Sequence, residues 1–399
     1  MSDRSKAHNN TGSRHRGACD VLEHDRTVAM TDPDDEITVL MCPDYRESNP
    51  YQSKLIAALE THDIDVTAMS GGWVFPLLTG VRRHGLPDVL HLHWLHRFVI
   101  TDRRFPAVVA VLLGIRLCLE LILLRVLGVR LVWTVHNLLD HERTAPRSEL
   151  AVRHAVARLV DRIVVHCEDA SESVSEAYRL PERVTDRVRV VPHGNFVDVY
   201  ADEVSQSTAR DRLDLPREVP VVTFFGMIRP YKNVPELIET FKRVGGDARL
   251  LVVGNPWNDN VAHRVRAAGT DDNRVHTVLE FVPEDEIQVY MRATDAVVLP
   301  FDSVLTSGSA VLAMTFGRAV VAPLLGCLPE LIGSNGGYLY DPTEPEGLST
   351  ALREAIDNRD RLQAMGRRNR EATEEFDWSR VAERTRDVYK LELEGSCRC

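Results

Sequence analysis

The sequence predicts an α/β protein built from two doubly wound domains. The chain has 399 residues, and roughly 100–200 residues form one domain, so two domains are expected. In both halves, short apolar runs typical of buried strands alternate with segments of helical spacing, which indicates parallel sheets covered by helices. A mixed and polar stretch, residues 193–219, separates the halves and is predicted to be the linker.

The first half begins after a polar leader. Residues 1–36 contain few large apolar residues and lack the apolar core of a signal peptide, so we expect them to be disordered. The strands expected next are residues 36–41, 64–66, 89–93, 130–135, 162–166 and 187–191. The helices expected between them include residues 50–60, 149–159 and 169–178.

The second half repeats this rhythm. Its expected strands are residues 220–225, 249–253, 276–279, 296–299 and 319–322. Its expected helices are residues 234–244, 260–267, 284–292 and 308–316. Ligands of such sheets bind beyond the carboxyl ends of the strands. The default site is therefore a cleft between the two domains.

The charge balance disfavours a nucleic-acid-binding protein. The chain has 59 acidic and 48 basic residues, for a net charge of −11, whereas nucleic-acid binders usually present a basic face. Only five residues are lysine, so a lysine inside a motif attracts notice. The lysine-poor, acidic composition fits both a salt-rich cytoplasm and an arginine-biased genome.

The cysteines predict free thiols in a reducing compartment. Seven cysteines are scattered along the chain, and none of them forms a CxxC pair. An odd, dispersed set is typical of a cytoplasmic protein rather than a disulfide-stapled secreted one. We therefore expect a cytoplasmic protein.

The most apolar segment, residues 105–127, has two interpretations. It approaches the length of a membrane span, but three charged residues interrupt it, and each would cost about 2.5–3.5 kcal/mol near a bilayer centre. Either it is a helix buried between the sheet and its neighbours, or it dips into the inner surface of the cell membrane. The second interpretation is a peripheral membrane contact through residues 97–127, where the arginines that meet anionic lipid are Arg97, Arg103, Arg104, Arg116 and Arg125.

The strongest chemical motif lies at residues 225–233. Gly226 follows a predicted strand and allows a tight turn, and Arg229 and Lys232 stand three residues apart before a predicted helix. Two cations beside free backbone N–H groups suit a diphosphate. The alternative is a solvated loop that carries two surface charges.

A second motif precedes the predicted helix 308–316. Small and hydroxyl-bearing residues follow a strand end there: Thr306, Ser307, Gly308 and Ser309. Such residues cap helices, and the same geometry aims N–H and hydroxyl groups at phosphate oxygens. Both roles are open.

A third motif follows the strand 130–135. His136 lies at the carboxyl end of that strand, and residues 140–142 add a second histidine and two acids. The spacing gives no helical i,i+4 pair of ligands, so a metal site is not favoured. We expect His136 to face the cleft and bind substrate hydroxyls, with a structural histidine as the alternative.

A fourth motif ends the strand 89–93. Alternation puts His91 and His93 on one face of the strand. His93 and Trp94 are predicted to line the acceptor side, where Trp94 offers a stacking surface for a sugar ring. The alternative is a packed aromatic residue beside a satisfied histidine.

Taken together, these residues resemble a GT-B fold glycosyltransferase, most similar to glycosyltransferase family 4 (group 1) and its exopolysaccharide and lipid-linked-sugar members. The resemblance implies two Rossmann-like domains that face a cleft. It also implies that Gly226, Arg229 and Lys232 bind the donor diphosphate, that His136 contacts the transferred sugar, and that Gly254 forms a second nucleotide-side turn. Residues 313–322 and 328–330 resemble the donor-site helix and the strand after it. Residues 376–378 resemble the start of a helix that crosses back to the first domain.

The resemblance sets the expected domain boundaries. They are a leader at residues 1–36, an acceptor-side domain at 37–200, a donor-binding domain at 201–375, and a crossing helix and tail at 376–399. The linker motif at residues 191–194 carries His193 where the family usually has asparagine.

The sequence also departs from the family pattern. Val304 and Leu312 occupy the positions where the family usually carries two donor-site glutamates. The Ser307–Ser309 loop is expected to replace the first of them. The N-terminal glycine loop is replaced by residues 48–52, which places Asn49 and Tyr51 on the acceptor side.

The expected activity is transfer of a hexose from a nucleotide-diphosphate sugar to a glycan or lipid-linked acceptor. The resemblance implies no bound metal, because GT-B relatives generally need none, and we expect no cofactor beyond the donor substrate. Retention of anomeric configuration is favoured; inversion would need a base, for which Asp44, His136 and Glu142 are candidates. The rival hypotheses are a sugar-nucleotide epimerase and a GT-B subunit without catalysis.

Overall fold

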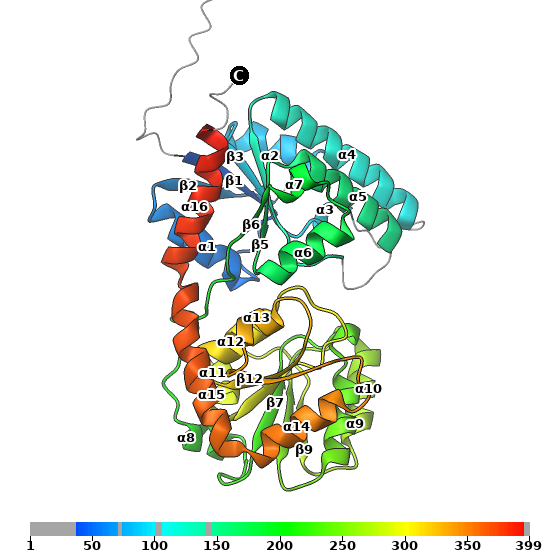
Figure 1. Ribbon diagram of the computed structural model, residues 1–399, viewed down its shortest axis with the longest axis vertical. Coiled ribbons are helices and arrows are strands. Elements are labelled where there is room, and N and C mark those ends of the chain that lie inside the picture. The colour runs from blue at the N-terminus through cyan, green and yellow to red at the C-terminus, as the bar shows by residue number, and fades with distance from the viewer. Residues whose placement is uncertain (1–36, 71–73, 100–105, 140–144, 395–399) are drawn as a thin grey trace, which may run out of the picture. The chain divides into compact units, whose positions relative to one another are not determined.

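Two six-stranded parallel sheets organise the computed structural model (Figure 1). The structure describes residues 37–70, 74–99, 106–139 and 145–394. The predicted leader at residues 1–36 lies outside the described residues. The sheets fall on either side of the predicted division of the chain and agree with the doubly wound α/β prediction.

The first sheet has the strand order β2-β1-β3-β4-β5-β6. Its strands are β1 (Ile37–Cys42), β2 (Ile64–Ala68), β3 (Val89–Leu92), β4 (Arg130–Thr134), β5 (Arg162–Val165) and β6 (Val188–Val190). The helices that accompany it are α1 (Pro50–Glu60), α2 (Pro76–His84), α3 (His96–Val99), α4 (Pro106–Val126), α5 (Pro146–Leu159), α6 (Glu168–Ala177) and α7 (Glu182–Thr185).

The second sheet has the strand order β12-β11-β10-β7-β8-β9. Its strands are β7 (Val221–Phe225), β8 (Arg249–Val253), β9 (Val275–Val278), β10 (Ala296–Val298), β11 (Ala319–Pro323) and β12 (Gly337–Tyr340). The helices in this part of the chain are α8 (Gln206–Arg212), η1 (Pro230–Lys232), α9 (Val234–Val244), α10 (Asp259–Gly269), α11 (Ile287–Ala293), α12 (Gly308–Thr315), α13 (Leu328–Ile332), α14 (Gly347–Asp357), α15 (Arg359–Ala372), η2 (Thr373–Phe376) and α16 (Trp378–Glu394).

Burial on both faces explains why the strands read as continuous apolar runs. In β1, Val39 and Met41 join the cluster that includes residues of α1 and α16. Leu40 and Cys42 join the opposite cluster, with residues of α4 and α5. Successive side chains of a strand point to opposite faces, so each face of the first sheet has its own core.

The C-terminal helix α16 returns to the first domain, as the resemblance implied. It packs against α1, and the Tyr389 hydroxyl lies 2.6 Å from His91 Nδ1 in β3. Trp378, at the start of α16, donates from Nε1 to the carbonyl of Asn195 at 2.8 Å. The crossing helix therefore fixes its first turn to the linker and its later turns to the first sheet.

The structure corrects one assignment of local structure and adds elements to the prediction. The predicted linker, residues 193–219, contains the helix α8, which is held by the buried pair Arg210–Asp295 at 2.7 Å. The structure also contains elements that were not predicted from the sequence: helices α2, α13, α14 and α15 and strand β12.

The buried interpretation of residues 105–127 holds for only one side of α4, where Leu117, Leu121 and Leu124 belong to the core of the first domain. Only 33% of the most apolar window of α4 is buried, and large aliphatic side chains along one side of the helix are exposed. Two of the arginines expected to meet lipid form ion pairs with carboxylates of the same chain instead. Arg116 lies 3.6 Å from Glu120, and Arg125 lies 2.7 Å from Asp161. Arg103 and Arg104 lie outside the described residues.

Candidate functional site

The two cationic and hydroxyl motifs of the second half meet where the strand order reverses. β7 has β8, its successor in sequence, on one side and β10 on the other. Loops that leave the carboxyl ends of such neighbours diverge, which opens a crevice where doubly wound folds bind ligands. Gly226 follows β7, Gly254 follows β8, and the loop after β10 leads to α12.

Gly226 and Gly254 allow two turns to approach closely. Both have positive φ, +125° and +148°, a region that side chains disfavour. The Gly226 N–H donates to the carbonyl of Val253 at 3.0 Å. A Cβ on Gly254 would lie 2.0 Å from the carbonyl oxygen of Gly226. Only glycine fits at residue 254.

Lys232 and Ser309 converge on Gly226. A Cβ placed on Gly226 would lie 3.0 Å from Ser309 Oγ and 3.6 Å from Lys232 Nζ. These groups come from η1 and from the first turn of α12. The left-handed Asn233 (φ 51°) turns the chain from η1 into α9 and donates to Asp302 at 3.0 Å. The first and second sequence motifs therefore form one site.

The charge of this site suits a dianionic ligand. Burial, with the positive charge of Arg229 beside it, lowers the pKa of Lys232 to about 8. The Arg229 guanidinium lies 4.3 Å from the centre of the Trp257 ring, a cation–π contact that holds it in place. A bound diphosphate would favour the protonated lysine, because an opposite charge stabilises the charged form.

The remaining residues of the second motif have distinct positions. Ser307 caps α12 by accepting from the N–H of Ala310 at 3.2 Å, which is the structural role left open by the sequence. Thr306 lines a cavity of about 380 Å³, and Gly308 faces Phe196 of the linker. Leu312, at a position where the family usually has glutamate, is buried in the core.

The first sheet places a histidine after each of four adjacent strands. His93 follows β3, His136 follows β4, His166 follows β5 and His193 follows β6. Because the strands are parallel and adjacent, their carboxyl ends bring the four imidazoles together. Contacts between their rings join them into one group, the histidine cluster.

Three members of the histidine cluster form a hydrogen-bonded chain. His166 Nδ1 lies 2.9 Å from the carbonyl oxygen of Val191, which can only accept, so Nδ1 donates and Nε2 accepts. His136 Nδ1 donates to that Nε2 at 3.3 Å, and His93 Nδ1 donates to His136 Nε2 at 3.0 Å. The chain ends at His93 Nε2, which is buried with no hydrogen-bond partner among the described residues.

Burial keeps the cluster uncharged. It lowers the pKa of His166 to about 4 and that of His193 to about 3, and lowers those of His93 and His136 well below their usual range. Neighbouring histidines add to the effect for His93, His136 and His193. Neutral imidazoles are what the donor–acceptor chain requires.

The residues predicted for the acceptor side surround this cluster. The Trp94 ring stacks on His136, with centroids 4.4 Å apart and planes 10° apart. Tyr51 is buried and contacts the rings of all four cluster histidines. Asn49 caps α1 by accepting from the N–H of Tyr51 at 3.0 Å. Their roles in acceptor binding stay a prediction.

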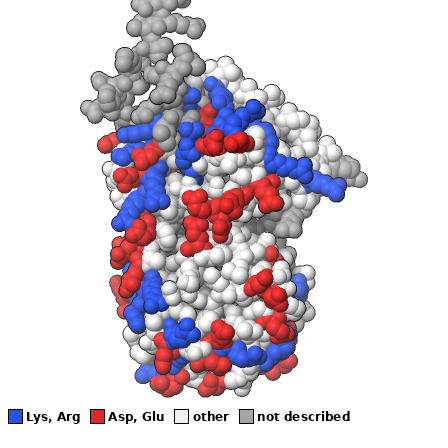
Figure 2. Space-filling model, viewed as in Figure 1, with Lys and Arg blue, Asp and Glu red and all other residues white. Residues whose placement is uncertain are grey.

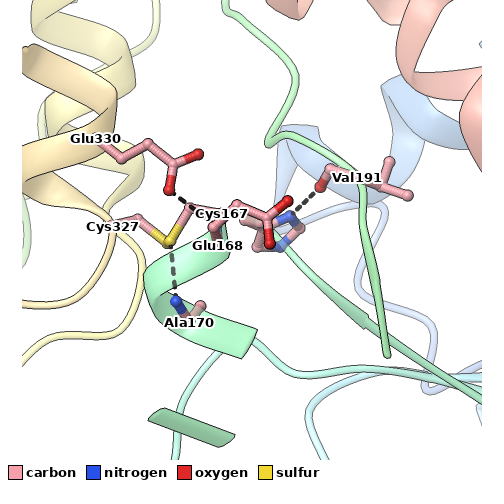
Figure 3. Close-up of a disulfide and its surroundings, with 7 residues drawn as sticks. Cys167, Glu168, Ala170, Val191, Cys327 and Glu330 are labelled. Atoms are coloured by element: carbon pink, nitrogen blue, oxygen red, sulfur yellow. Dashed lines mark hydrogen bonds between the residues drawn. A yellow bond between two sulfur atoms is a disulfide. The ribbon is translucent and has the colours of Figure 1, made fainter. Parts of the chain in front are cut away.

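A disulfide corrects the prediction of free thiols. Cys167, before α6, is bonded to Cys327, before α13, across 160 residues (Figure 3). The Glu330 carboxylate of α13 accepts from the N–H of Glu168 at 2.8 Å beside the disulfide (Figure 3). The prediction failed because a scattered pair meets only through the fold. Cys42 and Cys118 have free thiols.

Comparison with known proteins identifies the family. The model for glycosyl transferases group 1 matches residues 205–372. A GDP-mannose:glycolipid 4-beta-D-mannosyltransferase from Xanthomonas campestris is 30% identical over 64% of this chain and 67% of its own length. The chain belongs to the group 1 glycosyltransferases. An alpha-maltose-1-phosphate synthase from Mycolicibacterium smegmatis is 28% identical over 66% of this glycosyltransferase and 73% of its own chain.

Solved structures agree on the GT-B fold of this glycosyltransferase. A sucrose-phosphate synthase from Thermosynechococcus elongatus gives a TM-score of 0.70 at 17% identity, over 90% of this chain and 100% of its own. Anabaena Alr3699/HepE, solved in complex with UDP, gives a TM-score of 0.64 at 17% identity, over 89% of this chain and 99% of its own. The GT-B fold class expected from the sequence is confirmed.

The sequence did not predict the roles of two residues of the histidine cluster and its surroundings. His166 was assigned to a strand with no chemical role, although its place at the end of β5 was a usable signal. Tyr51 was assigned to the acceptor side by its loop alone, not as the centre of an aromatic cluster. The second histidine and the two acids of residues 140–142 lie outside the described residues. Within the described part of the chain, no three or more His, Cys, Asp or Glu side chains, the histidine cluster included, are placed so that they could hold a metal ion together.

Proposed function

We propose that this glycosyltransferase moves a hexose from a nucleotide-diphosphate sugar to a glycan or lipid-linked acceptor. One observation carries the proposal. Lys232 and Ser309 converge on the Gly226 turn at the point where the strand order reverses. This constellation offers a cation, a hydroxyl and a glycine turn to a diphosphate.

Lys232 and Arg229 have the central role in this proposal. As the bond from the sugar to the diphosphate breaks, negative charge grows on the leaving oxygens, and fixed cations that meet it lower the barrier. Because the pKa of Lys232 is lowered in the free protein, a bound anion stabilises the protonated form of this lysine. Ser309 adds a hydroxyl donor, and α12 contributes the positive end of its dipole.

The named relatives support the donor and acceptor classes. The Xanthomonas relative is named for GDP-mannose and a glycolipid, and others are D-inositol 3-phosphate glycosyltransferases. We propose a lipid-linked or glycan acceptor for this chain on that basis. The proposed location is the cytoplasm, where nucleotide sugars serve as donors.

Retention of configuration is the proposed stereochemistry. Inversion needs a free base, and two of the candidate bases are occupied. Arg46 hydrogen-bonds both carboxylate oxygens of Asp44 at 3.0 and 2.9 Å and lowers its pKa. Both ring nitrogens of His136 face other histidines. Glu142 lies outside the described residues. The product names of relatives include both alpha and beta, so the stereochemistry is proposed from this geometry.

A panel of nucleotides tests the proposal. Thermal unfolding is measured with uridine, guanosine and adenosine diphosphates and their hexose conjugates, because a bound donor raises the melting temperature. We expect the nucleotides of one nucleobase to raise the melting temperature of the wild-type protein. The same nucleotides should not raise that of the Lys232→Ala variant. Transfer to a lipid-linked acceptor is then followed with EDTA present, which we expect to leave the rate unchanged, and NMR assigns the anomer formed.

The same assays separate the alternatives. Stabilisation by no nucleotide would overturn the proposed function. Isomerised free donor in the absence of any acceptor would favour an epimerase. Donor hydrolysis or transfer would exclude a subunit without catalysis.

A further inference from the structure

Helix α4 presents an uncovered aliphatic face. Eight large apolar residues along this helix are 42–78% exposed and form what we call the α4 stripe: Val108, Val111, Leu112, Ile115, Leu119, Ile122, Leu123 and Val126. A rise of 1.5 Å per residue makes the stripe about 27 Å long. Figure 2 shows uncharged atoms along the edge where Figure 1 places α4. Monomeric soluble proteins rarely expose so large an apolar patch.

The charges of α4 lie away from the stripe. Glu120 is buried and accepts from the N–H groups of Leu77 and Leu78 at 3.0 and 3.1 Å. Arg116 pairs with Glu120 and donates to the carbonyl of Phe98 at 3.1 Å. Arg125 pairs with Asp161. These contacts fix the charged side of the helix to the protein and rule out a spanning orientation of α4 in this fold.

The composition of the stripe indicates lipid rather than protein. Protein interfaces are enriched in tyrosine, tryptophan and arginine, and their energetic centres seldom consist of leucine and valine alone. The stripe contains only valine, leucine and isoleucine. Two further exposed apolar residues, Val74 and Phe75, precede helix α2, which packs against α4.

Exposed arginines lie on the helices that pack against α4. Arg97 belongs to α3, and Arg82 and Arg83 end α2. In a chain of net charge −11, exposed cations on the helices next to α4 are complementary to anionic headgroups.

We propose that the α4 stripe docks this glycosyltransferase on an anionic membrane surface. The helix lies in the plane of the bilayer, its aliphatic side enters the boundary between headgroups and acyl chains, and the arginines of α2 and α3 meet lipid phosphates. The proposal goes beyond the proposed function, because docking needs neither donor nor acceptor. Docking on the membrane would bring the enzyme to a lipid-linked acceptor, while the enzyme takes its donor from solution.

Vesicle flotation without substrates tests the docking. We expect wild type to float with vesicles of phosphatidylglycerol and phosphatidylcholine, and to float less with phosphatidylcholine alone. The Leu112→Glu/Leu119→Glu variant is expected to bind about 100-fold more weakly. Phe281→Glu is the matched control, because Phe281 is 74% exposed on the second domain, and it should bind like wild type.

Three readouts keep the outcome decisive. Donor hydrolysis in solution should be equal in wild type and both variants, so loss of flotation is separable from failure of the proposed function. A tryptophan placed by Leu112→Trp should shift its emission to the blue with anionic vesicles, and Phe281→Trp should not. Absence of flotation at every lipid charge, or a wild-type dimer in solution that the double variant dissolves, would overturn the proposal and assign the stripe to a second copy.

Discussion

His93 Nδ1 lies 3.0 Å from His136 Nε2, and this contact occupies a ring nitrogen that the sequence had assigned to substrate. The second ring nitrogen of His136 faces His166. His136 therefore belongs to a chain whose direction is set by the Val191 carbonyl. A substrate hydroxyl can reach His136 only by replacing one of these partners.

The histidine cluster predicts a loss of stability on mild acidification. For His166 the folded pKa is about 4, below the ordinary value of about 6.5. The unfolded chain therefore binds the extra proton first, and stability falls as the pH drops from about 6.5 towards 4, by about 1.4 kcal/mol per pH unit for this residue. Urea unfolding at pH 7 and pH 5.5 measures the effect. His166→Gln should reduce the slope and the exposed His263→Gln should not; equal stability at both pH values would contradict the prediction.

Replacement of Lys232 is predicted to remove nearly all turnover without unfolding the protein. Loss of one preorganised stabiliser of transition-state charge typically costs about 100- to 1000-fold in rate, and we expect Lys232→Ala to fall in this range. Lys242→Ala is the matched control. Lys242 is in the last turn of α9, at the end away from the diphosphate site, and its Nζ lies 2.8 Å from Asp271. Circular dichroism checks the fold of both. Near-normal turnover of Lys232→Ala would refute the assignment of the diphosphate site.

Binding of a nucleoside diphosphate is predicted to weaken above pH 8. The pKa of Lys232 is about 8, so the free enzyme loses this positive charge as the pH rises through that value. Bound diphosphate raises the pKa, so binding in this range takes up a proton. Calorimetry at about pH 7.5 and about pH 9.5 in two buffers of different ionisation enthalpy tests both effects. Lys232→Arg should bind with little pH dependence, because arginine stays charged.

The disulfide is predicted to stabilise the oxidised protein. A bridge that closes a loop of 160 residues removes entropy from the unfolded chain, and its loss typically costs about 2–5 kcal/mol. Cys167→Ser should lower the free energy of unfolding by this amount and Cys118→Ser should not. Peptide mapping without reductant should recover Cys167 joined to Cys327. Alkylation of both thiols in the native, unreduced protein would be the contrary result.

Most donor-site residues could be predicted from local sequence patterns. Gly226, Arg229 and Lys232 lie within one short segment, and a strand, a turn and a helix start must bring them together. The β-strands were equally clear, because burial on both faces leaves continuous apolar runs. Ser309 was a weaker signal, since the same hydroxyl spacing occurs at ordinary helix caps.

Contacts between distant segments needed the tertiary structure. The sequence by itself determined the two doubly wound domains and the diphosphate motif, because both depend on neighbours within a few residues. Only the fold decided that Cys167 meets Cys327 and that four histidines from four strands share one cluster. The exposure of α4 was also decided there: its apolar pattern fits burial and docking equally well, and the sides covered by neighbouring helices depend on packing.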